Sequence, residues 1–174
     1  MKVLVAVATK HGSTREIADA IVEELRASGL EVDLRAAGSV IEIASYEAVV
    51  FGSAVYTGGW LADATRFAHA HSWALRRMPV WLFSSGPIGL EGTKLLGDRP
   101  EVPELLKLTQ AREHRVFRGK LDKQNLDAVD RYVTRVVQAP EGDFRDWEAV
   151  RDWARSIAAS LKRLEVHAVR GGDN

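Results

Sequence analysis

Apolar and polar positions alternate along the chain in blocks that predict buried strands and amphipathic helices. Three runs are almost continuously apolar, as strands buried on both faces are: 3–8, 48–54 and 79–85. Residues 13–28 repeat their apolar side chains at helical spacing, and Gly29 is placed to end that helix in a left-handed conformation. We expect further strands at 31–35 and 114–121, a short turn at 43–46, and helices at 61–75, 104–113, 123–137 and 146–164.

This alternation predicts an α/β fold in which a doubly wound parallel sheet carries helices on both faces, because parallel strands need crossover connections. Such sheets bind ligands beyond the carboxyl ends of their strands. Segments 9–14, 53–60 and 84–92 follow the three buried runs and are rich in Gly, Ser and Thr. We therefore expect one site where these three segments meet.

The composition of the chain limits the domain organisation, the partners and the chemistry that are compatible with that site. The 174 residues fit a single domain, 1–170, followed by a frayed tail at 171–174. The 24 Lys and Arg balance 24 Asp and Glu, and this zero net charge argues against a nucleic-acid partner. With no cysteine in the chain, redox chemistry would need a cofactor. No apolar run is long enough to span a membrane and no cleavage site follows the N-terminus, so we expect a cytoplasmic protein.

The loop after the first strand has two interpretations. Ser13 could be the N-cap of the following helix, with Glu16 completing a capping box. A capping box does not explain why Thr9 and Thr14 are present in this loop. The other interpretation is a phosphate at the helix N-terminus, where Thr9, Ser13 and Thr14 supply hydroxyls and Gly12 supplies room. The residues alone leave both open.

Several other sites on this architecture are excluded by the residues present. The loop has one glycine and its lysine on the wrong side for a Walker A motif, and the chain has no G-x-G-x-x-G or G-x-S-x-G motif. His69 and His71 are two apart in a predicted helix, which is poor geometry for a metal, and we expect no metal site. The five histidines are expected to be surface or packing residues.

The pattern Thr9-x-x-Gly12-x-Thr14-x-x-x-Ala18-x-x-Ile21 resembles the FMN-phosphate signature of flavodoxins, although Val7 stands where that pattern usually has an aromatic residue. The resemblance implies a five-stranded flavodoxin-like sheet of order 2-1-3-4-5 and FMN as cofactor. It places the phosphate on the first loop and one side of the flavin on the second, where Tyr56 and Trp60 are candidate stacking residues and Gly58 is a candidate for a peptide flip. The cofactor-binding residues it implies are Thr9, Lys10, His11, Gly12, Ser13, Thr14, Ala54, Val55, Tyr56, Thr57, Gly58, Ser85, Gly86, Pro87, Ile88 and Gly89.

The stretches "TREIADAI", "VVFGSAVYTGGW", "RGKL" and "GDFRDWEAVRDWARSIA" resemble the flavodoxin-type protoporphyrinogen IX dehydrogenases that use a quinone as acceptor. Those proteins carry an extra segment after the fifth strand, which residues 122–142 match in position. The resemblance implies an FMN-dependent oxidoreductase acting on a porphyrinogen and a quinone, with at most peripheral membrane contact through the helix at 123–137.

The alternative is a flavodoxin-type electron carrier that docks on reductase and acceptor proteins. Carriers of that kind are usually strongly acidic, so the zero net charge counts against it. No acid–base residue stands out as catalytic, and the oligomeric state is left open. Trp147 and Trp153 lie six residues apart in the last helix and are expected to pack rather than to contact the cofactor.

Overall fold

The computed structural model describes residues 1–56, 59–86, 101–122 and 141–171, and its centre is a parallel β-sheet. The strands are β1 (Lys2–Ala8), β2 (Glu31–Ala36), β3 (Ala48–Tyr56), β5 (Val80–Ser85) and β6 (Glu113–Phe117). They pair in the order β2-β1-β3-β5-β6, all parallel. The expected five-strand order is therefore confirmed. Within the described residues, three short strands are added to it: β4 (Gly59–Trp60) pairs with β3, and β7 (Lys120–Leu121) and β8 (Gly142–Asp143) form a separate two-stranded sheet.

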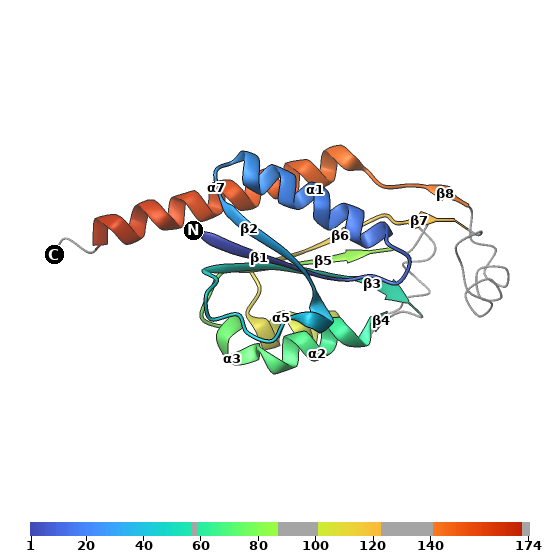
Figure 1. Cartoon of the computed structure of the whole chain (residues 1–174), viewed down its shortest axis with the longest axis horizontal. Helices are drawn as coiled ribbons and strands as arrows, with labels where there is room; N and C mark the ends of the chain where they lie inside the picture. Colours follow the sequence, from blue (N-terminus) through green and yellow to red (C-terminus); the bar gives the residue numbers. More distant parts are fainter. Residues whose placement is uncertain (57–58, 87–100, 123–140, 172–174) are drawn as a thin grey trace.

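Helices cover both faces of this sheet (Figure 1). α1 (Ser13–Ala27) and α7 (Trp147–Gly171) pack side by side on one face. The other face carries α2 (Ala62–Ala70), α3 (Ser72–Leu75), α5 (Glu101–Thr109) and the 3-10 turn η1 (Ala37–Ser39). Each face has its own apolar cluster, and the doubly wound architecture is confirmed.

The central strands are apolar throughout because both of their faces are covered. In β1, Val3, Val5 and Val7 pack towards α1 and α7, while Leu4 and Ala6 pack towards α2. All five are at most 2% exposed. Burial on both faces removes the alternation of a half-exposed strand and leaves a continuous apolar run.

Glycine has a packing role at Gly52 in β3. A β-carbon built there would lie 2.4 Å from the ring of Phe83 in β5, which is fully buried. The ring occupies the space above the strand that any other residue would fill. Gly52 therefore lets a large aromatic side chain sit directly on the sheet.

Helix α1 ends as its sequence predicts. Gly29 has φ 86°, its N–H donates to the Arg26 carbonyl (2.8 Å), and the Leu30 N–H donates to the Leu25 carbonyl (3.2 Å). These two hydrogen bonds form a Schellman motif. Leu25 and Leu30 are both buried in the same cluster, which supplies the apolar contact that accompanies the motif.

Several predicted boundaries differ in the structure. The helix predicted at 61–75 is broken at His71 into α2 and α3, and the helix predicted at 104–113 is α5, which ends before Gln110 because that residue has φ 52°. The strand predicted at 114–121 is split into β6 and β7 (Lys120–Leu121), and β7 pairs antiparallel with β8 (Gly142–Asp143). β3 continues past Ala54 to Tyr56 and pairs antiparallel with β4 (Gly59–Trp60).

The C-terminal part of the chain also differs from the predicted boundaries. The helix predicted at 123–137 lies outside the described residues, as do residues 172–174 of the predicted tail. Helix α7 begins at Trp147 and runs to Gly171, beyond the predicted end at Leu164. Within the described ranges, no helix is both long and apolar enough to cross a bilayer.

Candidate functional site

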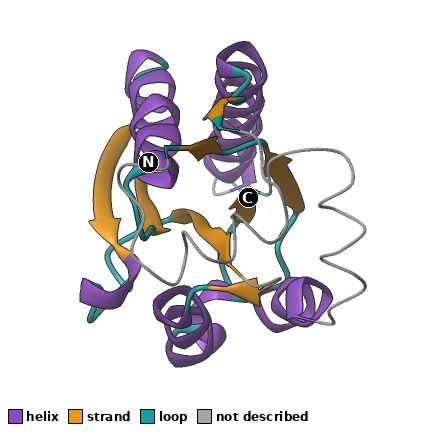
Figure 2. Cartoon of the chain, turned by 90° about the vertical axis from the view of Figure 1, so that its right-hand side faces the viewer, coloured by secondary structure: helices purple, strands orange, loops and turns teal. Residues whose placement is uncertain are grey.

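The carboxyl ends of three central strands lie at one edge of the sheet. Ala8 of β1 pairs with Ser53 of β3, and Ser53 pairs with Ser84 of β5, while β3 runs on to Tyr56. The segments that follow these paired residues therefore start at one edge, which Figure 2 shows face-on. The strand order reverses between β1 and β3, and doubly wound folds bind their ligands at such a point.

The first loop turns tightly from β1 into α1. The Thr9 hydroxyl oxygen accepts the Gly12 N–H (3.1 Å), and Gly12 has φ 87° and ψ −22°, which makes it the N-cap of α1. A β-carbon at Gly12 would meet nothing within 4 Å, so the loop is open on that side. The predicted capping box is wrong: Ser13 is already the first helical residue, and α1 has no side-chain hydrogen bond capping its start among the described residues.

The start of α1 is rich in hydrogen-bond donors. The Glu16 N–H donates to the Gly12 carbonyl (3.1 Å), which is the first hydrogen bond of the helix. Helical geometry therefore leaves the N–H groups of the three preceding residues without an intrahelical acceptor. Together with the hydroxyls of Thr9 and Ser13, both half-buried, these donors have the chemistry that a phosphate group needs. Thr14 is only 1% exposed, whereas Thr9 and Ser13 are half-buried.

Tyr56 joins the second segment to the first loop. The Lys10 ammonium lies 5.1 Å from the centre of the Tyr56 ring, and the His11 ring lies 5.9 Å away at a tilt of 58°. Tyr56 and Val55 are half-buried, while Ala54 is 6% exposed. These contacts bring the two predicted loops together. Thr57 and Gly58 lie outside the described residues.

Trp60, the other aromatic candidate of this segment, packs on the core. It is 7% exposed and stands edge-on to Phe51 at 5.2 Å between ring centres. Its indole N–H donates to the Ser84 hydroxyl (2.8 Å), and the neighbouring Leu61 N–H donates to the Ser53 hydroxyl (2.9 Å). Of the two roles considered for Trp60, the structure therefore supports packing.

The third segment begins at the end of β5. Ser85 is 4% exposed, and Gly86 has φ 104° while its N–H donates to the Phe117 carbonyl of β6 (3.0 Å). A β-carbon at Gly86 would lie 3.7 Å from the Val55 carbonyl, so the second and third segments are also neighbours. Pro87, Ile88 and Gly89 lie outside the described residues.

A Ser–His pair at this edge, with the serine buried and the histidine half-buried, was not predicted. The Ser84 hydroxyl is 2.8 Å from Nε2 of His114 in β6, and Ser84 is 3% exposed. The Trp60 indole donates to the Ser84 oxygen, which leaves the Ser84 O–H able to donate to His114 in the state whose Nε2 carries no proton. Burial lowers the pKa of His114, which agrees with this neutral state. No local sequence pattern indicates this pair, because its members lie 30 residues apart.

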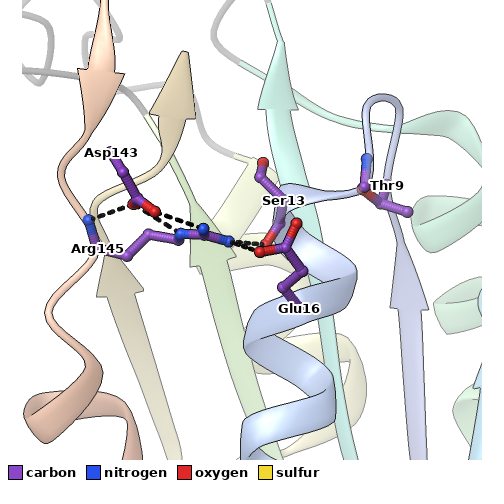
Figure 3. A network of polar contacts seen from close by, with 6 residues as sticks. Thr9, Ser13, Glu16, Asp143 and Arg145 are labelled. Atoms are coloured by element: carbon purple, nitrogen blue, oxygen red, sulfur yellow. Dashed lines mark hydrogen bonds and ion pairs between the residues drawn. The ribbon is translucent and has the colours of Figure 1, made fainter. Parts of the chain in front are cut away.

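A second unpredicted group is Arg145, which follows β8 and reaches the start of α1 (Figure 3). Its side chain is 3% exposed and pairs with Glu16 (2.8 Å) and Asp143 (2.6 Å). It also donates to the Ser13 carbonyl (3.2 Å) and lies over the Trp147 ring at 4.4 Å. Hydrogen bonding from Arg145 lowers the pKa of Asp143, and Asp143 in turn raises the pKa of Arg145.

Comparison with known proteins agrees with this geometry. A family model described as "Flavodoxin domain" matches residues 4–147. The chain is 26% identical over 172 residues to the protoporphyrinogen IX dehydrogenase (quinone) of Escherichia coli K12, covering 91% of this chain and 95% of that protein.

Solved structures show the same fold. A flavodoxin from the domain Archaea matches with a TM-score of 0.63 and 14% identity, over 93% of this chain and 99% of that chain. Oxidised flavodoxin 2 from Bacillus cereus matches with a TM-score of 0.57 and 22% identity, over 93% and 99% of the two chains. The family model, together with these flavodoxin neighbours, indicates FMN as the cofactor and an oxidoreductase as the class of protein. The chain belongs to the flavodoxin domain family.

Proposed function

We propose that FMN binds at the carboxyl edge of the sheet, with its phosphate in the first loop and its flavin between the second and third segments. The phosphate would be held by Thr9, Gly12, Ser13 and the N–H groups at the start of α1, with Lys10 supplying outer charge. Two observations support this placement. The donors gather around one open turn at Gly12, and the first loop contacts the second segment at Tyr56.

The remaining predicted contacts are part of the same proposal. Tyr56 is the candidate for stacking on the flavin, beside Ala54, Val55, Thr57 and Gly58. Ser85, Gly86, Pro87, Ile88 and Gly89 would offer backbone groups to the pyrimidine edge. The side chains of His11 and Thr14 would support the loop, because His11 lies against the Tyr56 ring and Thr14 is 1% exposed, while the Thr14 N–H stays among the donors at the start of α1.

For the reaction, we propose oxidation of protoporphyrinogen IX, or a related reduced substrate, with a quinone as acceptor. Bound FMN supplies the chemistry, since a flavin can take electrons from a reduced organic substrate and pass them on. The chain's own residues would bind and orient the cofactor. The observation that carries this proposal is the similarity to the Escherichia coli dehydrogenase, which extends over 91% of this chain and 95% of that protein.

An electron carrier that docks on partner proteins is the second candidate, since flavodoxins match 93% of the chain in structure. Those two structures are 14% and 22% identical to this chain in sequence, so they support the fold alone. The zero net charge favours the enzyme, because carriers use a charged surface to steer docking. A cytoplasmic location and peripheral contact with a membrane stay predictions.

The deciding experiment is an anaerobic assay of the purified, FMN-loaded protein with protoporphyrinogen IX and menaquinone. We expect the flavin absorbance to bleach with the porphyrinogen and to return when the quinone is added. The matched control is the apo-protein, which should oxidise no porphyrinogen above the background rate. If the loaded protein binds FMN but does not react with the porphyrinogen, and instead exchanges electrons with a flavodoxin reductase, the carrier is the correct function.

A further inference from the structure

We propose that Arg145 is a positioning residue for the phosphate-binding loop: it fixes the Ser13 peptide and neutralises Glu16 beside the site of the anion. The inference rests on the proposed FMN site. Arg145 lies 132 positions away from Ser13 in the chain.

The contacts of Arg145 converge on the first turn of α1. Nη1 donates both to the Ser13 carbonyl (3.2 Å) and to Glu16 Oε2 (2.8 Å). On the other side, Nε and Nη2 donate to the two carboxylate oxygens of Asp143 (2.8 and 2.6 Å). A bidentate pair of this kind holds a guanidinium in one orientation. Figure 3 shows the side chain lying between Asp143 and the start of the helix.

The segment that carries Arg145 is itself anchored at the site. The Phe144 N–H, next to Arg145, donates to the Gly119 carbonyl (3.2 Å) in the paired segment before β7. A β-carbon at Gly119 would lie 3.5 Å from the backbone of Gly86, the start of the third segment. The β7–β8 ribbon therefore lies against Gly86 of the third segment, and Arg145, which follows β8, hydrogen bonds to Ser13 of the first loop.

Glu16 explains why a cation is needed there. Its carboxylate lies in the first turn of α1, near the end of the helix where an anion would bind. Left unpaired, that negative charge would repel a phosphate. Arg145 neutralises it at 2.8 Å and also binds the Ser13 carbonyl. Because a peptide is planar and trans, fixing that carbonyl also fixes the Thr14 N–H, which points the opposite way, towards the helix N-terminus.

Arg155 offers a comparison. It belongs to α7 and, like Arg145, pairs with a carboxylate of α1, here Glu24 at 3.3 Å, with a second contact to Asp152 at 2.5 Å, although its side chain is 50% exposed against 3% for Arg145. Glu24, however, lies in the last turns of α1, far along the helix from the phosphate loop. A general loss of contact between α1 and the C-terminal part of the chain should follow either substitution, whereas an effect on the phosphate should be confined to Arg145.

The test compares Arg145→Gln with Arg155→Gln by titrating each apo-protein with FMN and with riboflavin, alongside apo melting curves. We expect Arg145→Gln to weaken FMN binding by roughly three- to tenfold and to leave riboflavin binding unchanged. Arg155→Gln should alter neither. The FMN loss should shrink as ionic strength rises, because the Glu16 side chain is 54% exposed and its charge is screened by salt.

The double variant Glu16→Gln/Arg145→Gln shows whether Arg145 acts by neutralising the Glu16 charge or by stabilising the fold. Without the Glu16 charge, replacing Arg145 should cost less than about threefold in FMN affinity. The single variant Glu16→Gln keeps Arg145 and should bind FMN at least as tightly as wild type. If Arg145→Gln does not fold, Glu16→Gln still tests the inference. Weaker FMN binding by Glu16→Gln than by wild type would overturn it.

The outcomes are distinct. If wild-type protein binds FMN and riboflavin equally, the proposed phosphate site is wrong and the inference falls with it. If wild-type protein prefers FMN and Arg145→Gln keeps that preference in full, or weakens both ligands by the same factor, only the role of Arg145 is wrong.

Discussion

Ser13 occupies the first helical position of α1, and Gly12, with φ 87°, is the N-cap. The Ser13 hydroxyl is therefore not used to cap the helix. It remains at the first helical position, half-buried, beside the open side of the loop. This strengthens the case for a ligand at the start of α1.

The first prediction is that Ser13→Ala weakens FMN binding about 10- to 150-fold, since a hydrogen bond to a charged group contributes ~1.5–3 kcal/mol. Riboflavin, which has no phosphate, should bind as it does to wild type. Apo stability should change by no more than ~0.5 kcal/mol, because alanine is a good helix former and no cap is lost. Flavin fluorescence titrations and denaturant melts measure both quantities.

Ser28→Ala is the matched control. Ser28 follows the other end of α1, is also half-buried, and should affect neither ligand. If Ser13→Ala lowers apo stability while FMN affinity stays at the wild-type value, Ser13 has a structural role and the phosphate lies elsewhere.

At the scale of elements, the edge of the site is held by a polar chain that crosses three strands. Trp60 of β4 donates to Ser84 of β5, which contacts His114 of β6. Ser84 is buried, and its O–H can donate to His114 when Nε2 carries no proton. Protonation of His114 would make Nε2 a second donor to the Ser84 oxygen and would take away the acceptor of the Ser84 O–H.

The second prediction concerns the pH dependence of stability. Burial lowers the folded-state pKa of His114, so below about pH 6.5 the unfolded chain binds a proton that the folded chain resists. The free energy of unfolding should therefore fall as the pH drops from 7.5 to 5. In His114→Gln, whose side-chain oxygen can accept the Ser84 hydroxyl, this fall should be smaller.

Denaturant unfolding at both pH values measures the difference. His69→Gln is the control, because His69 is exposed in α2 and its replacement should leave the pH dependence close to that of wild type. An equal pH dependence in wild type and His114→Gln would mean that the pair with Ser84 does not control protonation.

The elements most accurately predicted were those whose pattern reflects burial alone. β1, β3 and β5 are continuous apolar runs because both faces are covered, so the residue types alone indicate their burial. Pairing between distant segments produces no comparable pattern in the sequence. The extension of β3 to Tyr56 depends on its partner β4, and the break between β6 and β7 depends on the partner β8.

The site was predictable where it follows from topology. Parallel strands place their carboxyl ends in one row, so the three Gly-, Ser- and Thr-rich segments had to start at one edge. Arg145 and His114 were missed because each acts through a partner far away in the sequence, at separations of 129 and 30 residues. The resemblance to a family supplied the cofactor, which residue types alone had left open.

For the whole molecule, the net charge predicts how strongly electrostatic attraction steers its association with other proteins. With a net charge of zero, the chain lacks the excess charge that steers an electron carrier onto a basic partner. The third prediction is that FMN-loaded protein reduces a basic acceptor such as cytochrome c at a rate that depends only weakly on ionic strength. A steep fall in rate with added salt would favour the carrier.

The central claim is that the loop at the start of α1 binds the phosphate of FMN. Its most direct test is titration of the wild-type apo-protein with FMN and with riboflavin, which share the flavin and differ by the phosphate. Two or more hydrogen bonds to the phosphate, each contributing ~1.5–3 kcal/mol, predict that FMN binds about 100-fold more tightly or better. Equal dissociation constants for the two ligands would contradict the account.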